Sequence, residues 1–263
     1  MGQLVKVLIT IKTYPHPSRK YDELVCTGGV LEDGNFIRIY PINYRDRPYS
    51  EQYRKYQWII IEVEKNPKDN RPESYRPVGA KLKILGEPLK SENNWAERKK
   101  YVLAKGHDTM CYLKSLDDSE RSLGIIKPKK VIDVIVEEEE DRDWKPTWQA
   151  ALQQMNLFDN KNKPLKKIPY KFKYHFICEK EGCKGHKMMN EDWEIGALFR
   201  RMLLKYDDEN IAIDKVKHKM LSDICGHDKD TYFFVGTIFR YGTYVILGAF
   251  YPKKENSQSS FLK

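Results

Sequence analysis

Two cysteines and a histidine lie close together in the segment CEKEGCKGH, residues 178–186. Cys178, Cys183 and His186 offer two thiolates and an imidazole, which are the ligands that Zn²⁺ prefers in proteins. Glycines between them permit a tight turn that could point all three at one ion. The fourth ligand of a tetrahedral site could be one of three other residues: His175, Cys225 or His227. The sequence therefore predicts a structural zinc knuckle, with a glycine-rich turn that holds buried free thiols as the alternative.

Two acids follow this segment, Asp192 and Glu194. With His186 they could form the site of a metal-dependent nuclease or hydrolase. Carboxylates also stabilise the positive end of a helix dipole, and residues 190–206 are expected to form a helix. No P-loop, GxGxxG, HExxH or GxSxG motif occurs in the sequence. We therefore favour the helix-start role and predict a protein without a catalytic reaction of its own.

Charge is distributed unevenly along a chain whose net charge is +9. Residues 161–189 carry nine lysines and two acids, whereas residues 137–143, EEEEDRD, carry six acids and one arginine. Such separation predicts one surface for polyanions and another that solvates or repels them, with an ordinary solvated surface as the alternative. The candidate phosphate-binding lysines are Lys166, Lys167, Lys171, Lys173, Lys184 and Lys187. DNA or RNA is the polyanion that we expect.

The strand before the knuckle alternates rings and charges. With period two, the aromatic residues at positions 170–176 share one face, and Lys171, Lys173 and His175 share the other. Single-stranded nucleic acid would need cations and rings together. We therefore expect the rings in the core and the lysines in water.

The elements that position these residues begin with β-strands. Strand patterns cover residues 4–12, 57–65, 80–86 and 129–137, and a hairpin over 23–42 turns at Asp33-Gly34. A helical insertion is expected over 92–118. This pattern predicts an N-terminal small β-barrel with a helical insertion, residues 1–137.

A second unit is expected over 167–263, after a connector of 138–166 that holds the acidic run, a short helix and a polar linker. It should contain a strand over 168–177, the knuckle, the helix with Asn190 as N-cap, and a hairpin around Gly242. The predicted fold class is α+β, with the barrel followed by a C-terminal α+β unit that carries the zinc knuckle.

The hairpin segment VCTGGVLEDGNFIRIYPI resembles the N-terminal barrel modules, OB-like or PUA-like, of uncharacterised prokaryotic proteins, some found in phage-defence settings. The shared residues are Cys26, Gly28, Phe36, Arg38, Tyr40 and Pro41. The resemblance covers about a third of the chain. It implies a concave face that binds nucleic acid or nucleotide-like ligands, with Arg38, Tyr40, Arg45 and Arg47 as candidates. Ordinary exposed arginines are the alternative.

The segment QMNLFD resembles the pentapeptide by which many bacterial DNA-handling proteins bind the sliding clamp of the replicative polymerase. The matching residues are Gln154, Met155, Leu157 and Phe158. This resemblance implies a sliding clamp, or another protein, as a partner. The alternative is that these side chains end the preceding helix and pack into the core.

The apolar runs and the cysteine count of the sequence predict where in the cell the protein is found. The longest apolar run, residues 244–251, is too short to span a bilayer, and no secretory signal is recognisable. An odd number of cysteines, five, argues for reduced thiols. We expect a cytoplasmic protein that does not contact membranes. The predicted function is a nucleic-acid-binding accessory or sensor in prokaryotic genome maintenance or phage defence. A metal-dependent hydrolase and a protein-binding adaptor are the alternatives.

Overall fold

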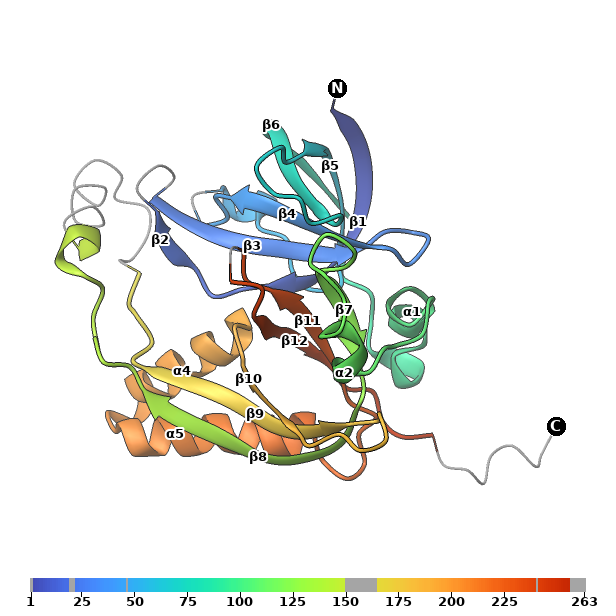
Figure 1. Cartoon of the computed structure of the whole chain (residues 1–263). Coiled ribbons are helices and arrows are strands. Elements are labelled where there is room, and N and C mark those ends of the chain that lie inside the picture. The colour runs from blue at the N-terminus through green and yellow to red at the C-terminus, as the bar shows by residue number, and fades with distance from the viewer. Residues whose placement is uncertain (1, 19–21, 46, 150–164, 240, 256–263) are drawn as a thin grey trace.

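A closed five-stranded β-barrel forms the N-terminal part of the protein. The computed structural model describes residues 2–18, 22–45, 47–149, 165–239 and 241–255. The barrel strands, in their order around the sheet, are β1 (Gln3–Lys12), β5 (Trp58–Lys65), β6 (Ser74–Leu85), β4 (Phe36–Ile42) and β3 (Asp22–Val30). Pairing between β1 and β3 closes the barrel. The short strand β2 (His16–Ser18) pairs antiparallel with the first residues of β3. The predicted barrel is therefore present (Figure 1).

Alternating apolar side chains fill the barrel. Val7 and Ile9 of β1 pack against Ile37 and Ile39 of β4 in one fully buried cluster. The predicted hairpin joins β3 to β4, and Gly34 in its turn has a φ of 81°. A φ in this range is open to glycine and strained for most other residues, so Gly34 allows the tight reversal.

Two three-stranded sheets and two longer helices form most of the described structure outside the barrel. One sheet has the order β10 (His186–Met189), β9 (Tyr170–Cys178), β8 (Pro128–Glu138), and the other β12 (Tyr244–Phe250), β11 (Tyr232–Thr237), β7 (Leu123–Ile126). Helices α4 (Trp193–Tyr206) and α5 (Glu209–His218) lie against the first sheet (Figure 1). A π-helical turn, η2 (Lys219–Ile224), follows α5. The protein is thus a mixed helix-and-strand structure, and the predicted hairpin around Gly242 is formed by β11 and β12.

The rings of β9 lie in the core, as the alternation predicted. Phe172, Tyr174 and Phe176 are buried, and they pack against Phe199 of α4 and Phe233 of β11. The opposite face of β9 carries partly exposed residues. Burial of alternate residues therefore fixes which way the lysines of this strand point.

The strand predicted over 129–137 exists as β8, but it is not a barrel strand. It pairs with β9 over almost its whole length, from Pro128 opposite Cys178 to Glu138 opposite Tyr170. The barrel closes without it, through β1 and β3. Strand patterns specify a strand and its buried face, but they do not specify which edge it joins.

The helical insertion is present as α1 (Glu92–Val102) and α2 (Met110–Leu113). A short 3₁₀ turn, η1 (Tyr49–Glu51), lies earlier in the chain, between β4 and β5. The first turn of α1 is irregular, because Asn93, Asn94 and Trp95 have positive φ angles. The N-cap of α4 is Asp192, whose carboxylate accepts a hydrogen bond from the amide of Glu194 at 3.1 Å. The prediction of Asn190 as N-cap is therefore wrong, and Asn190 instead accepts from the amide of Asp192.

A buried polar network joins the barrel to the second unit. Arg38 on β4 donates to the hydroxyl of Ser122 at 3.0 Å and to the carbonyl oxygens of Ser122 and Thr237. Glu73 accepts from the amide and the hydroxyl of Ser122, at 3.0 and 2.7 Å. These charge-assisted hydrogen bonds hold the barrel against the β7–β11 sheet. Among the described residues, no helix is long and apolar enough to cross a bilayer.

Candidate metal centre

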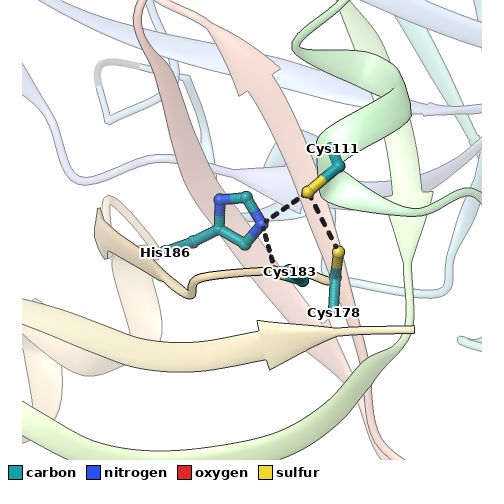
Figure 2. Close-up of side chains that lie close together, drawn as sticks. All are labelled: Cys111, Cys178, Cys183 and His186. Atoms are coloured by element: carbon teal, nitrogen blue, oxygen red, sulfur yellow. Dashed lines mark hydrogen bonds between the residues drawn. The ribbon is translucent and has the colours of Figure 1, made fainter. Parts of the chain in front are cut away.

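Three cysteines and one histidine meet at one end of the β10-β9-β8 sheet. Cys178 is the last residue of β9, Cys183 lies in the following turn, and His186 begins β10. Cys111 reaches the same point from α2, as Figure 2 shows. One ligand atom from each residue lies within 4.8 Å of the others. This Cys₃His cluster could hold a metal ion.

Local backbone geometry brings three of these side chains together. Gly182 and Gly185 have φ angles of 71° and 97°, which make the turn between β9 and β10 tight. The strands then pair so that His186 lies opposite Phe176, on the buried face that Cys178 also occupies. Three of the four ligands are therefore placed by one hairpin.

Helix α2 supplies the fourth ligand. Thr109 caps this single turn, since its hydroxyl accepts a hydrogen bond from the amide of Tyr112 at 3.2 Å. Met110 and Leu113 are fully buried and anchor the turn in the core. Cys111, between them in sequence, points to the hairpin (Figure 2).

Three of the distances within the Cys₃His cluster are close to the edges of a tetrahedron around one ion. The Sγ atoms of Cys111 and Cys178 are 3.6 Å apart, and Nε2 of His186 lies 3.5 Å from Sγ of Cys111 and 3.3 Å from Sγ of Cys183. With Zn–S of about 2.3 Å and Zn–N of about 2.0–2.1 Å, a tetrahedron has S–S edges of about 3.8 Å and S–N edges of about 3.5 Å. The donor set is thus both chemically suitable and spaced for one tetrahedral ion.

Ionisation of these groups reflects their shared burial. Burial raises the pKa of Cys111 to about 11, and the neighbouring thiols of Cys178 and Cys183 act in the same direction. Burial also opposes ionisation of Cys183, but hydrogen bonds from the amides of Cys178 and Gly185 bring its pKa below the ordinary value. Desolvation, together with the charge of Lys114, lowers the pKa of His186, so its imidazole is neutral, the form that binds metals.

None of the three residues suggested as fourth ligand belongs to the cluster. His175 lies on the opposite face of β9, where it pairs with Asp133 and Lys187. Cys225 contacts Tyr174 and Thr231, and burial raises its pKa to about 12. His227 is exposed and lines a different groove. All five cysteines are free thiols, and Cys111 was missed because 67 residues separate it from Cys178.

Asp192 and Glu194 do not join this cluster. Among the described residues, the group of metal-ligating side chains contains only the three cysteines and His186. Asp192 is buried at the N-cap of α4, where both its oxygens lie 2.7 Å from Nζ of Lys55. Glu194 is exposed and lies 3.3 Å from the same amine. The helix-start role expected for Asp192 is confirmed.

The arginines of the barrel differ in their access to solvent. Arg38 is only 3% exposed, so burial excludes it from a surface that nucleic acid could contact. Arg45 and Arg47 are partly buried, and Arg47 pairs with Glu51 at 3.3 Å. Tyr40 is 42% exposed and stays a candidate.

The lysines of β9 and of the segment before it are largely neutralised by their neighbours. Lys171 lies 3.2 Å from Glu139, and Lys173 lies 2.5 Å from Glu137. Lys167 lies 3.8 Å from Glu139. The acidic run and the basic strand are separate in sequence but adjacent in the sheet, because β8 pairs with β9. The expected separation into two surfaces is therefore wrong for these residues, although Lys166 remains exposed.

Unpaired lysines gather instead around the metal centre. We define the lysine surface as Lys114, Lys129, Lys130, Lys180, Lys184 and Lys187, all exposed. In the described ranges, no carboxylate oxygen lies within 4.0 Å of any of these amines. Lys187 lies in the β9–β10 hairpin, opposite His175, and Lys130 of the neighbouring strand β8 lies opposite Ile177. Glu181 in the turn is also exposed, whereas Glu179 is paired with His107 at 2.7 Å.

A groove of 570 Å³ continues this surface beyond β8. Its lining includes Lys129, Lys130, His227 and Lys254. Lys127 and Lys229 also line it, but they are paired with Asp230 and Asp228. The candidate protein-binding residues, Gln154, Met155, Leu157 and Phe158, lie outside the described residues.

Comparison with known proteins follows the two parts of the fold. A family model described as a domain of unknown function, DUF8757, matches residues 106–263, which include every ligand of the Cys₃His cluster. The chain belongs to this family. A second model, described as a domain of unknown function, DUF8758, matches residues 3–104, which include the barrel and α1. No curated protein matches the DUF8757 chain.

A likeness was also found among solved structures. The chain titled "Structure of murine DNA binding protein bound with ds DNA" aligns over 97% of each chain, with 9% identity and a TM-score of 0.29. A TM-score this low supports no inference about the fold or the function of the DUF8757 chain.

Proposed function

We propose that this protein is a zinc-stabilised nucleic-acid-binding accessory or sensor, without a catalytic reaction of its own. The observation that carries the proposal is the closed Cys₃His cluster with unpaired lysines around it. The resemblance of the hairpin over 23–42 to barrel modules of prokaryotic proteins favours a role in genome maintenance or phage defence.

Zinc is the metal that suits this donor set. Three thiolates and an imidazole in a tetrahedron are typical of structural zinc, whereas calcium and magnesium prefer oxygen ligands. Four protein ligands leave no open position for a water molecule or a substrate. The site would therefore stabilise the joint between α2 and the β9–β10 hairpin, rather than perform chemistry.

Polyanion binding follows from the charges beside that joint. A lysine already paired with a carboxylate adds little net attraction for phosphate, so Lys167, Lys171 and Lys173 are poor contacts. Lys180, Lys184 and Lys187 keep their full charge and are exposed on the turn and strand that the metal holds. Each such contact with phosphate would release condensed counterions.

Salt dependence of binding tests this assignment. Affinity for labelled single-stranded DNA, duplex DNA and RNA is measured by fluorescence anisotropy at several salt concentrations. Replacing Lys180, Lys184 and Lys187 with Ala should reduce the slope of log K against log salt by about 2–3, close to one for each lost contact.

A triple variant matched in number and residue type serves as control. Replacing Lys167, Lys171 and Lys173 with Ala should leave that slope within about one unit of wild type. An equal reduction of the slope in both triple variants would indicate that both sets of lysines contact phosphate. Wild-type protein that binds none of the three nucleic acids at low salt would refute the proposed function.

A further inference from the structure

A second group of charged side chains, outside the Cys₃His cluster, lies where β1 ends beside the start of α4. Lys55 is almost fully buried, at 7% exposure, and lies between Asp192 at 2.7 Å and Glu194 at 3.3 Å. Its ammonium is thus neutralised by two carboxylates. The nucleic-acid function proposed above uses none of these residues.

Lys12, the last residue of β1, lies beside this buried ion pair and has no carboxylate partner. Its amine donates to the hydroxyl of Tyr44 at 3.2 Å, and in the described parts of the chain no carboxylate oxygen comes within 4.0 Å of it. The ring centroids of Tyr44 and Trp193 lie 4.4 and 4.7 Å from Nζ. These contacts fix the position of the amine.

Opposing effects set the charge of Lys12. Burial and the neighbouring ammonium of Lys55 favour the neutral amine, whereas the carboxylates of Glu194 and Asp192 and the two rings favour the ammonium. Burial is the largest effect, and the pKa of Lys12 is lowered to about 8. At neutral pH, the fraction of neutral amine is then about two orders of magnitude larger than for an ordinary lysine.

Lys12 lines a groove that runs along α4 and η2. Its volume is 820 Å³, and its walls include Lys12, Trp193, Arg201, Lys215 and Tyr251. Arg201 and Lys215 are exposed and, within the described ranges, unpaired with any carboxylate at 4.0 Å. Lys219 and His218 also line the groove, but they face Asp223 at 3.2 and 3.9 Å. Asp192 and Glu194 line the groove as well, but both face Lys55. Arg201 and Lys215 are therefore the cations of the lining that remain to attract a small anion.

We propose that Lys12 is the reactive amine of a second site, which takes a small anionic carbonyl compound from this groove and holds it as an imine. A lysine that is partly desolvated beside another cation is the arrangement that activates amines toward carbonyl groups. Arg201 and Lys215 would attract the negative group of the ligand.

The reaction needs no oxidant, reductant or metal. The lone pair of Nζ forms a bond to the carbonyl carbon while the carbon–oxygen π bond breaks, the nitrogen gives up one proton to solvent, and the former carbonyl oxygen takes up one proton from solvent. The resulting carbinolamine then loses water, whose hydrogen atoms come from the amine and the added hydroxyl. The product is a carbon–nitrogen double bond to Lys12, and hydrolysis reverses each step.

Reductive trapping with glyoxylate tests the proposal. The whole protein is incubated at pH 7.5 with glyoxylate and cyanoborohydride, and carboxymethylation is measured for each lysine by peptide mass spectrometry. Lys12 should be modified at least about tenfold faster than Lys83, an exposed lysine of β6, because more of its amine is neutral. Modification of Lys12 at or below the rate of Lys83 would overturn the proposal.

Charge preference is tested with a neutral carbonyl and a surface variant. Arg201→Ala, at an exposed position, should slow the modification of Lys12 by glyoxylate about threefold or more, and should leave its modification by acetaldehyde unchanged. If Arg201→Ala changes neither rate, the groove does not select an anion and this part of the proposal is wrong. Lys12→Arg should keep the melting temperature of wild type, and its loss of the fast-reacting site would confirm the assignment of the modified residue.

Discussion

Replacing Cys111 tests whether the metal centre joins distant parts of the chain. Cys111→Ser removes the ligand that α2 contributes, while Cys178, Cys183 and His186 remain in one hairpin. The variant should therefore lose tight metal binding. It should also lose the link between α2 and β9.

The size of the effect follows from chain entropy. Cys111 and Cys178 are 67 residues apart, and a cross-link over that separation stabilises the folded state by about 4 kcal/mol. Cys178 and Cys183 are five residues apart, and a cross-link between them contributes only about 2 kcal/mol. In a chain of this size, a loss of about 4 kcal/mol lowers the melting temperature by about 10 °C.

The assay combines elemental analysis with thermal melting. Wild-type protein should carry about one zinc per chain, and a chelator should lower its melting temperature by about 10 °C or more. Cys111→Ser should bind little zinc and should melt at the same temperature with and without chelator. Cys225→Ser is the matched control, because this thiol lies outside the Cys₃His cluster and its loss should not change the zinc content.

Two results would refute the reasoning. Zinc bound in equal amount and with equal affinity by Cys111→Ser would show that Cys111 is not a ligand. A metal-free wild-type protein whose melting temperature ignores chelator and added zinc would remove the metal centre altogether.

Three further predictions concern other parts of the molecule. Desolvation lowers the pKa of His16, but its hydrogen bond and charge contact with Glu191, at 3.5 Å, together with Glu139, raise it above the ordinary value. The stability that His16 contributes should therefore be present below about pH 6.5 and disappear as the pH rises through the raised pKa. Wild type should melt at a higher temperature than His16→Gln at pH 6 but not at pH 9. A difference in melting temperature that grows toward pH 9 would contradict this pH dependence. Arg38→Ala should lower the free energy of unfolding by about 3–5 kcal/mol in urea titrations, because it removes the cation that donates to the hydroxyl and carbonyl oxygens of Ser122 and that lies near the Glu73 carboxylate. The carbonyl oxygen of Thr237 keeps its hydrogen bond from Arg71. A neutral effect would mean that the network does not hold the barrel. If residues 154–158 are a docking peptide, Phe158→Ala should abolish binding to a sliding clamp without changing the melting temperature. A loss of about 3–5 kcal/mol of stability, together with a wild-type protein that binds no clamp, would instead place Phe158 in the core.

Local patterns predicted the local structure of this protein well. The alternation in β9 identified its buried rings, Asp33-Gly34 marked the β3–β4 hairpin, and the spacing of Cys178, Cys183 and His186 marked three of the four ligands. Each of these features depends on residues within a few positions of one another. Strand period, turn chemistry and ligand spacing are properties of such short segments, so the amino-acid sequence determines them directly.

Tertiary structure decided the features that depend on distant segments. It brought Cys111 to the hairpin, placed β8 beside β9 so that Glu137 and Glu139 neutralise the neighbouring lysines, and buried Arg38 against Ser122. No local signal marks such pairings, because they depend on which edges and faces come together when the whole chain excludes water from its core. The charge runs in the sequence therefore did not reveal that Lys171 and Lys173 pair with acids of β8, and the position of the exposed lysines beside the Cys₃His cluster became apparent only in the folded protein.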